Sequence, residues 1–255
     1  MRRLFLLVMF LAALVFSLFA FTPLGFVLNQ SGIGGLGVGW AKADGTLIKG
    51  RISGLYVGTR PERGSQPIGD VSLELQPLSL LSFRPTYRVQ WSGAGGQGTA
   101  RLTLSRNALR ASEVRMRQEI GAVEGLAPAV RAMGGQLDVS DGSFTLTQTG
   151  CETASGQLST NSLATLAAQY GRQFGVVSGP ISCDQGAFIL SMQGESDAAD
   201  RVQIDARAAL TGQGDFTTRV QTQDAQIIIA LTQIGFSREN GEFVYRQSRS
   251  LGMQR

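Results

Sequence analysis

An uncharged apolar segment near the N-terminus constrains this chain most strongly. Arg2 and Arg3 precede the eighteen residues Leu4–Phe21, which contain neither a charge nor a proline, and the next charged residue is Lys42. Crossing a hydrocarbon core about 30 Å thick takes roughly 20 apolar residues of helix, at about 1.5 Å each. Residues 4–28 supply this length, and we therefore predict a transmembrane helix there.

A cleavable signal peptide is the alternative for this segment. Signal peptides carry an apolar run of about 7–15 residues, followed by a cleavage site of the small-x-small type. The run here is longer, Leu18 disfavours cleavage after Ala20, and the A-x-A tripeptide Ala41–Ala43 lies far beyond the run. We expect an uncleaved anchor that leaves residues 1–3 in the cytoplasm by the positive-inside rule, with the remainder of the chain translocated.

Charge and the missing histidine exclude several functional classes. The formal net charge is +4, and two of these charges belong to Arg2 and Arg3, so the translocated part is near neutral. No run of basic residues indicates a nucleic-acid partner. Because the chain has no histidine, a Ser-His-Asp or Cys-His mechanism and a histidine-ligated metal site are impossible. We expect a protein that is not an enzyme, with no catalytic residues, no cofactor and no metal.

Two patterns that resemble functional sites are better explained by local structure. Gly32–Gly37 matches the dinucleotide-binding pattern G-x-G-x-x-G, but it follows the apolar segment and no helix is expected after it. We assign residues 29–44 to a linker. Four carboxylates are expected to serve turns rather than catalysis, namely Asp138, Asp141, Asp197 and Asp200.

The two cysteines, Cys151 and Cys183, are expected to form a disulfide. An even number of cysteines in a translocated domain favours this pairing, and a metal site is disfavoured because the chain has neither a third cysteine nor a histidine. The chain-entropy model gives the closed loop roughly 3.5–4 kcal/mol of stabilisation.

Strand signals dominate the chain after the linker. Alternating apolar and polar residues, with a period of two, indicate strands with one buried face and one wet face. They occur at Val71–Leu75, Leu102–Leu104, Phe144–Leu146, Phe188–Met192, Val202–Ile204 and Phe216–Val220. Ala225–Ile234 is more continuously apolar, and we predict a strand covered on both faces. We expect tight hairpin turns at Asp141-Gly142 and Asn240-Gly241. The pattern predicts an antiparallel meander with one apolar face over residues 45–248, followed by a tail of residues 249–255.

Two helices are expected within this meander. In the first, apolar residues recur at helical spacing from Leu163 to Phe174; Thr160 or Asn161 can cap its start and Gly175 can end it. This helix lies inside the Cys151–Cys183 loop, so the disulfide would fix it over its flanking strands. A weaker helix is predicted at Val123–Met133. Four aromatic residues are expected either in the core or at the membrane interface, namely Trp40, Tyr56, Tyr87 and Trp91.

The most specific signal is the block Gly45–Leu81. It indicates a strand, a turn, a second strand, a loop and a long alternating strand ended by Pro77, after which Leu78–Leu81 is expected to turn onto the apolar face. Together with the preceding apolar segment, the paired cysteines and Gly179–Gly186 leading into Ala187–Met192, this block resembles the type II secretion system protein N family, also called general secretion pathway protein N. The match is one of pattern, since Leu73 stands where an aromatic residue is expected.

The resemblance implies a mainly β protein with few helices. Its single N-terminal transmembrane helix would be followed by a periplasmic curved antiparallel sheet or two-layer β domain. It would be a single-pass inner-membrane protein and a non-catalytic accessory component of the machine that exports folded proteins across the outer membrane, with other type II secretion proteins as partners. The block also resembles AsmA-like proteins, which implies a lipid-binding or lipid-transfer module as the alternative. An open groove lined by Val71–Leu75, Phe188–Met192 and Val202–Ile204 would favour lipid handling, whereas a closed core would oppose it.

Overall fold

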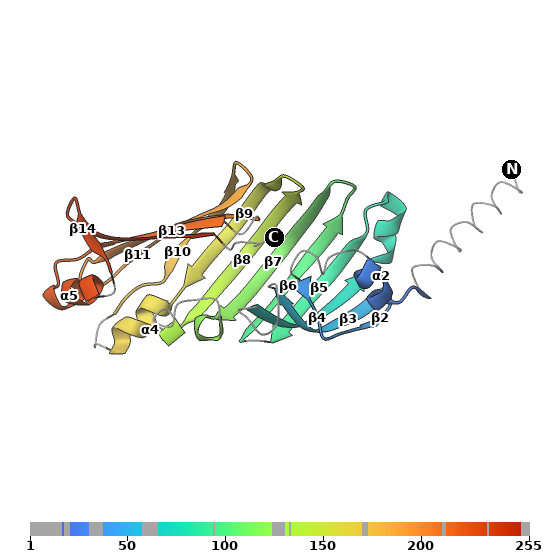
Figure 1. Ribbon diagram of the computed structural model, residues 1–255, viewed down its shortest axis with the longest axis horizontal. Coiled ribbons are helices and arrows are strands. Elements are labelled where there is room, and N and C mark those ends of the chain that lie inside the picture. The colour runs from blue at the N-terminus through green and yellow to red at the C-terminus, as the bar shows by residue number, and fades with distance from the viewer. Residues whose placement is uncertain are drawn as a thin grey trace, which may run out of the picture. The chain divides into compact units, whose positions relative to one another are not determined.

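The structure is a computed structural model, and Figure 1 shows its helices and strands. Its chain forms two compact units. The first comprises Met1–Thr103 with Val123–Gly125, and the second comprises Leu104–Ala122 with Leu126–Arg255. The residues that the structure describes are 17, 21–30, 38–57, 66–93, 95–123, 131–132, 134–169, 173–210, 213–233 and 235–250. Antiparallel strands with few helices make up both units, which confirms the predicted mainly β class.

The first unit is an antiparallel meander in which successive strands pair in the order β1-β3-β4-β5-β6, with β2 also paired to β3. A short helix precedes the meander and a 3₁₀ helix connects β4 to β5. The elements are α2 (Leu24–Gln30), β1 (Val38–Gly39), β2 (Lys42–Gly45), β3 (Lys49–Val57), β4 (Gln66–Leu75), η2 (Pro77–Ser82), β5 (Thr86–Gly93) and β6 (Gly96–Leu104).

One face of this meander forms the core of the first unit. Its buried centre consists of Leu24 from α2 with Ile52, Val71 and Val89 from three consecutive strands. Ser72 and Glu74 on the same β4 strand are exposed, which confirms the predicted alternation. The side chains packed against this centre include Trp40, Tyr87 and Trp91, so these aromatics are core residues.

The start of the chain meets this unit at α2. Thr22 accepts a hydrogen bond from Leu47 N–H at 3.3 Å, and Leu24 packs so closely on Gly50 that a Cβ there would lie 2.5 Å from Leu24 Cδ2. Among the described residues, no helix has both the length and the apolar character needed to cross a membrane. Residues 4–16 and 18–20 of the anchor predicted at residues 4–28 lie outside the described residues. The end of that prediction is wrong, because residues 24–28 belong to α2, and Leu24 and Leu28 pack in the core of the first unit. Strand β1 and all of β2 except Gly45 fall within the stretch 29–44 that was predicted as a linker, while Gly32–Gly37 lies outside the described residues.

The second unit is a longer antiparallel meander. Its strands pair in the order β7-β8-β9-β10-β11-β12-β13-β15-β14. The strands are β7 (Ala108–Glu119), β8 (Gln136–Thr147), β9 (Gly150–Thr160), β10 (Val177–Asp184), β11 (Ala187–Glu195), β12 (Arg201–Ala209), β13 (Gln213–Gln221), β14 (Ser237–Glu239) and β15 (Glu242–Ser250). Its helices are η3 (Ile120–Ala122), α4 (Ser162–Gln169) and α5 (Ala225–Gln233).

Helices α4 and α5 contribute to the apolar core of the second unit. Leu163 of α4 packs against the buried side chains of β8–β11 and also against those of β12, β13 and β15. Helix α4 begins at Ser162, where Thr160 Oγ1 accepts a hydrogen bond from the Ser162 N–H at 3.2 Å, and this confirms the predicted helix from Leu163 to Gln169. The predicted extension to Phe174 is wrong at its end, because Phe174 forms a β-bridge with Ser196. The buried residues of the two clusters are Val139, Leu158, Val177, Met192, Val202, Val220, Leu231 and Phe243.

The predicted strand at Ala225–Ile234 is wrong, because Ala225–Gln233 forms helix α5. Asp224 caps this helix: its Oδ1 accepts hydrogen bonds from Gln226 N–H at 2.8 Å and from Ile227 N–H at 3.0 Å. Leu231 is buried, whereas Ile229 is 59% exposed, so only one stripe of the segment is covered. A carboxylate that accepts hydrogen bonds from the free N–H groups of the first turn favours the start of a helix. The sequence prediction overlooked Asp224 because the three consecutive isoleucines, Ile227–Ile229, favour a strand.

One predicted hairpin turn is confirmed and the other is wrong. Asn240 and Gly241 connect β14 to β15 with φ of 49° and 89°, as a tight turn with two positive φ angles requires. Asp141 and Gly142 instead lie inside β8, where the register with both neighbouring strands shifts and Asp141 has a φ of 51°. A β-bulge uses the same tolerance of positive φ as a turn, and the sequence pattern does not separate the two.

Two further predictions concern segments near the edges of the described residues. Most of the helix predicted at Val123–Met133 lies outside them, at 124–130 and 133. Strand β15 runs to Ser250, and the rest of the predicted tail, residues 251–255, also lies outside the described residues.

Candidate interaction surfaces

The disulfide lies where the pairing of β9 with β10 stops. The ladder between these strands runs from Thr160 and Val177 to Gln157 and Pro180, and proline has no N–H with which to continue it. Further along, Cys151 of β9 is bonded to Cys183 of β10, with their Cα atoms 5.7 Å apart. The disulfide therefore joins the β8–β9 hairpin to the β10–β11 hairpin at a point that the strand ladder does not reach.

A backbone contact accompanies this link. The Cys151 N–H donates to the Gly186 carbonyl at 2.9 Å. Gly150, with a φ of 125°, approaches the same turn so closely that a Cβ on it would lie 2.3 Å from the Gly186 oxygen. Gln185 and Gly186, with φ of 47° and 78°, form the tight turn between β10 and β11. Glycine at positions 150 and 186 is thus required for the two hairpin ends to meet.

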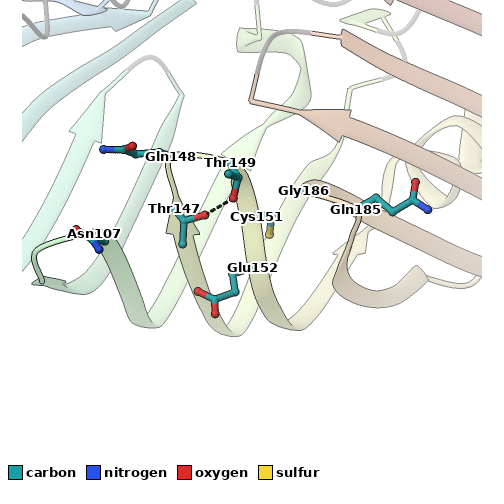
Figure 2. Close-up of a pocket in the computed structure, with 8 residues that line it drawn as sticks. All are labelled: Asn107, Thr147, Gln148, Thr149, Cys151, Glu152, Gln185 and Gly186. Carbon is teal, nitrogen blue, oxygen red and sulfur yellow. Dashed lines mark hydrogen bonds between the residues drawn. The ribbon is translucent and has the colours of Figure 1, made fainter.

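An open crevice adjoins the disulfide, as Figure 2 shows. In this view Asn107 and Gln185 lie at its two ends, with Glu152 between them. The Thr147 and Thr149 hydroxyls are hydrogen-bonded to each other at 2.9 Å. The crevice is lined by Asn107, Thr147, Gln148, Thr149, Cys151, Glu152, Gln185 and Gly186. Most of these side chains are neutral hydrogen-bonding groups and both sulfurs are held in the disulfide, so the crevice is suited to polar contacts with a partner.

The polar face of the second unit carries a hydrogen-bonded carboxylate, Asp205 of β12. Its oxygens accept hydrogen bonds from Ser191 Oγ at 2.8 Å, from Gln203 Nε2 at 2.9 Å and from the Arg219 guanidinium. Partial burial alone would raise the pKa of Asp205, but these three donors and the charge of Arg219 outweigh it and hold the pKa below its usual value. The network joins β11, β12 and β13 on the face opposite the apolar core.

An ion pair between Arg246 and Glu239 lies at the β14 edge of this unit. Arg246 of β15 binds Glu239 of β14 through two hydrogen bonds, of 2.6 and 2.8 Å, and this contact lowers the pKa of Glu239. Strand β14 pairs with β15 only from Glu242 to Val244. On the side of β15 that faces β14, Tyr245–Ser248 has no strand partner among the described residues, although the other side of β15 pairs with β13. Such an edge presents N–H and C=O groups to a partner.

Apolar side chains are exposed in the first unit at η2. Leu78 and Leu81 are 81% and 80% exposed, and Phe83, directly after the helix, is 92% exposed. The prediction that Leu78–Leu81 turns onto the apolar face is therefore wrong for its two outermost leucines. We call Leu78, Leu81 and Phe83 the η2 ridge. Sequence reasoning missed it because leucines after a strand look the same whether they cover the core or face solvent.

Of the carboxylates predicted to serve turns, Asp138 lies in a strand and Asp200 lies in a loop. Asp138 lies within β8 and pairs with Arg117 at 2.8 Å, which raises the pKa of the arginine. Asp200 closes the β11–β12 loop by accepting a hydrogen bond from Ser196 Oγ at 3.0 Å. In the part of the chain that the structure describes, no three carboxylate, cysteine or histidine side chains are grouped as a metal site would require.

Comparison with known proteins gives one match. A family model described as Type II secretion system (T2SS), protein N matches residues 36–246, which include most of both units. No curated protein and no solved structure matches the chain significantly.

Proposed function

Because the chain belongs to the type II secretion system protein N family, we propose that it is a non-catalytic accessory component of this export machine. Its single-pass anchor in the inner membrane lies within the apolar run of residues 4–21, before α2, with the N-terminus in the cytoplasm. The two β units lie in the periplasm and bind other components of the secretion system. The family match over residues 36–246 is the observation that carries this proposal.

The construction of the units supports a role in binding. Each unit buries the apolar face of its sheet in its own core, with Leu24 of α2 in one unit and α4 and α5 in the other. The opposite faces carry ion pairs such as Arg51–Asp70 and Arg207–Asp184. What remains available to partners is a set of surfaces at strand edges and hairpin ends, and these are the parts of a sheet that commonly bind other chains.

The anchor and the role in secretion are tested together by complementation. A strain that lacks the protein should lose secretion of folded proteins, and the full chain should restore it. A version in which residues 1–21 are replaced by a cleavable signal peptide should leave the membrane fraction and restore secretion poorly. Normal secretion in the deletion strain, with no secretion component recovered on the tagged chain, would contradict the proposal.

The partner-binding surfaces are tested by site-specific photocrosslinking of the tagged full chain in cells. A photoreactive residue at Gln185, beside the crevice, or at Ser248, on the β15 edge, should link the chain to secretion components. Ser72 provides the control, because it is exposed on the polar face of β4 in the first unit and belongs to neither surface. Equal crosslinking from Ser72 would show that neither surface is specific.

Lipid handling is the second candidate, and one observation favours it. Towards the hairpin ends of the second unit, Phe216 is 38% exposed, and the edge-to-face pair Phe144–Phe188 is also only partly buried. An open groove lined by the apolar residues of Val71–Leu75, Phe188–Met192 and Val202–Ile204 would favour lipid handling. Val71, Met192 and Val202 of these segments are instead buried in packed cores. The burial of Val71, Leu75, Met192 and Val202 supports the binding role, whereas the partial exposure of Leu73, Phe188, Leu190 and Ile204 keeps lipid contact as the second candidate. Co-purified lipid, identified by mass spectrometry at a fixed ratio to protein, would reverse this preference.

A further inference from the structure

The η2 ridge is a rigid projection of apolar side chains. Ser79 holds the turn from inside: its hydroxyl donates to the Gln76 carbonyl at 2.6 Å and accepts from the Thr86 N–H at 2.9 Å. The Gln76 N–H donates to the Thr86 carbonyl at 2.8 Å, and Ser82 Oγ donates to the Ser79 carbonyl at 2.8 Å. These bonds fix a backbone whose outward side chains are Leu78, Leu81 and Phe83.

The exposed apolar surface of the η2 ridge indicates a binding site for a membrane or another molecule. The three side chains are 80% exposed or more, and they are clustered within six residues of the chain, from 78 to 83. Scattered exposed apolar residues are normal, but a cluster held by its own hydrogen bonds marks a contact with a membrane or another molecule. Arg84 follows Phe83 directly and is also exposed, which places a cation at the base of the ridge.

The ridge lies at the end of the first unit where the N-terminal segment enters. Leu47 N–H donates to the Thr22 carbonyl at 3.3 Å, and Leu75 N–H, at the end of β4, donates to the Ile48 carbonyl at 2.8 Å. The turn between β2 and β3 therefore contacts both the entering chain and the strand end from which η2 starts. Figure 1 shows α2 beside this end of β2 and β3.

The spacing brings the ridge close to the membrane surface. Phe21, the last residue of the run that contains neither a charge nor a proline, is 80% exposed and directly precedes Thr22, so no linker separates an anchor that ends at Phe21 from the folded unit. Neighbouring strands are about 4.8 Å apart, so two such steps place the end of β4 about 10 Å from the entry point. The headgroup region is roughly 5–7 Å deep on each side of the bilayer, a depth that side chains projecting from η2 can reach.

We propose that the η2 ridge inserts into the periplasmic interface of the inner-membrane bilayer, beside the chain's own anchor. This inference rests on the anchored topology of the proposed function. Leu78, Leu81 and Phe83 enter the boundary between headgroups and acyl chains, and Arg84 contacts lipid phosphates. A second attachment next to the anchor fixes the tilt of the first unit on the membrane surface.

Depth-dependent fluorescence quenching tests the proposal on the full chain. Leu81→Cys, labelled with an environment-sensitive fluorophore, is reconstituted into vesicles of phosphatidylethanolamine and phosphatidylglycerol with or without spin-labelled lipid. The native cysteines are joined in a disulfide, so the label attaches only to the introduced thiol. Leu78→Cys provides a second position on the ridge. Ser92→Cys is the matched control, because it is exposed and lies at the far end of β5 from Thr86.

Spin-labelled lipid should remove most of the fluorescence from positions 81 and 78 and little from position 92. No quenching at either ridge position, in chains that float with the vesicles, would overturn the insertion while leaving the anchor intact; the ridge would then be free for a protein partner. Equal quenching at all three positions would show that the sheet lies flat on the bilayer and would also overturn the proposal. Chains that do not float with the vesicles would refute the anchor, and the insertion with it.

Discussion

Replacing Cys151 and Cys183 together by alanine removes the covalent link between the β8–β9 and β10–β11 hairpins. The strand ladder between β9 and β10 stops at Gln157 and Pro180, so beyond this point the disulfide and the Cys151 N–H bond to Gly186 hold the hairpins together. The cysteines are separated by 32 positions. For a loop of this length the chain-entropy model gives about 3.7 kcal/mol of stabilisation. We expect most of this free energy to be lost from the second unit.

Urea unfolding of the detergent-solubilised full chain measures the loss. With a slope of about 2 kcal/mol per molar urea, the transition of the second unit should move down by roughly 2 M. Hydrogen exchange read by mass spectrometry assigns the change to segments: amides of β9 and β10 should exchange much faster in the double variant. Trp40 and Trp91 both lie in the first unit, so tryptophan fluorescence provides an internal reference.

The alanine variant is compared with the oxidised and the reduced wild type. Alanine avoids placing a hydroxyl at buried position 151, so the loss reports the link rather than an unsatisfied polar group. Reduction of the wild type should reproduce most of the effect. If the double variant keeps wild-type protection in β9 and β10, the disulfide does not hold these hairpins together and the reasoning is refuted.

Three further predictions concern single residues in the second unit. Asp224→Ala should destabilise α5 by about 1 kcal/mol through loss of its N-cap, measured by thermal unfolding, whereas Asp224→Asn should keep most of the stability. Gly179→Ala should destabilise by about 1–3 kcal/mol or more, because its Cβ would lie 1.7 Å from the Ser191 oxygen. Gly121→Ala, with its nearest atom at 3.6 Å, is the control and should be near neutral. The lowered pKa of Asp205 means that its ionised form stabilises the fold above the unfolded-state pKa, and that this stability is lost as pH falls through the folded-state pKa. Asp205→Asn should therefore be less stable than the wild type at pH 7, with the difference disappearing under strongly acidic conditions; a pH-independent difference would contradict this assignment.

Local patterns predicted the parts of the fold whose signal is contained in a few neighbouring residues. Alternation at Val71–Leu75 indicated a strand with one buried face, and Asn240-Gly241 indicated a tight turn, because two positive φ angles suit these residue types. The spacing from Leu163 onward indicated helix α4. Each inference depends on backbone preference and on one apolar face, and both are properties of the segment itself.

The errors arose where two structures satisfy the same local pattern. Asp141-Gly142 fits a hairpin turn and a bulge equally well, and the partners of β8 on both sides decided for the bulge. The isoleucines of α5 suit a strand and an apolar helix stripe alike, and the Asp224 cap with the core beneath Leu231 decided for the helix. At η2 the sequence shows leucines after a strand whether they cover the core or face solvent. The hydrogen bonds of Ser79 fix the turn in which Leu78 and Leu81 face solvent.

By itself, the sequence determined the class of protein: strand periodicity and glycine turns require a mainly β chain, the missing histidine removes whole classes of chemistry, and the block Gly45–Leu81 carried the family resemblance that the match over residues 36–246 confirmed. Only the tertiary structure decided which surfaces are left for partners. The exposed η2 ridge is held by hydrogen bonds among residues 76–86, whereas the crevice beside the disulfide and the partly paired β15 edge depend on contacts between residues far apart in the chain. Such contacts are set by strand register and packing, and a single sequence records neither.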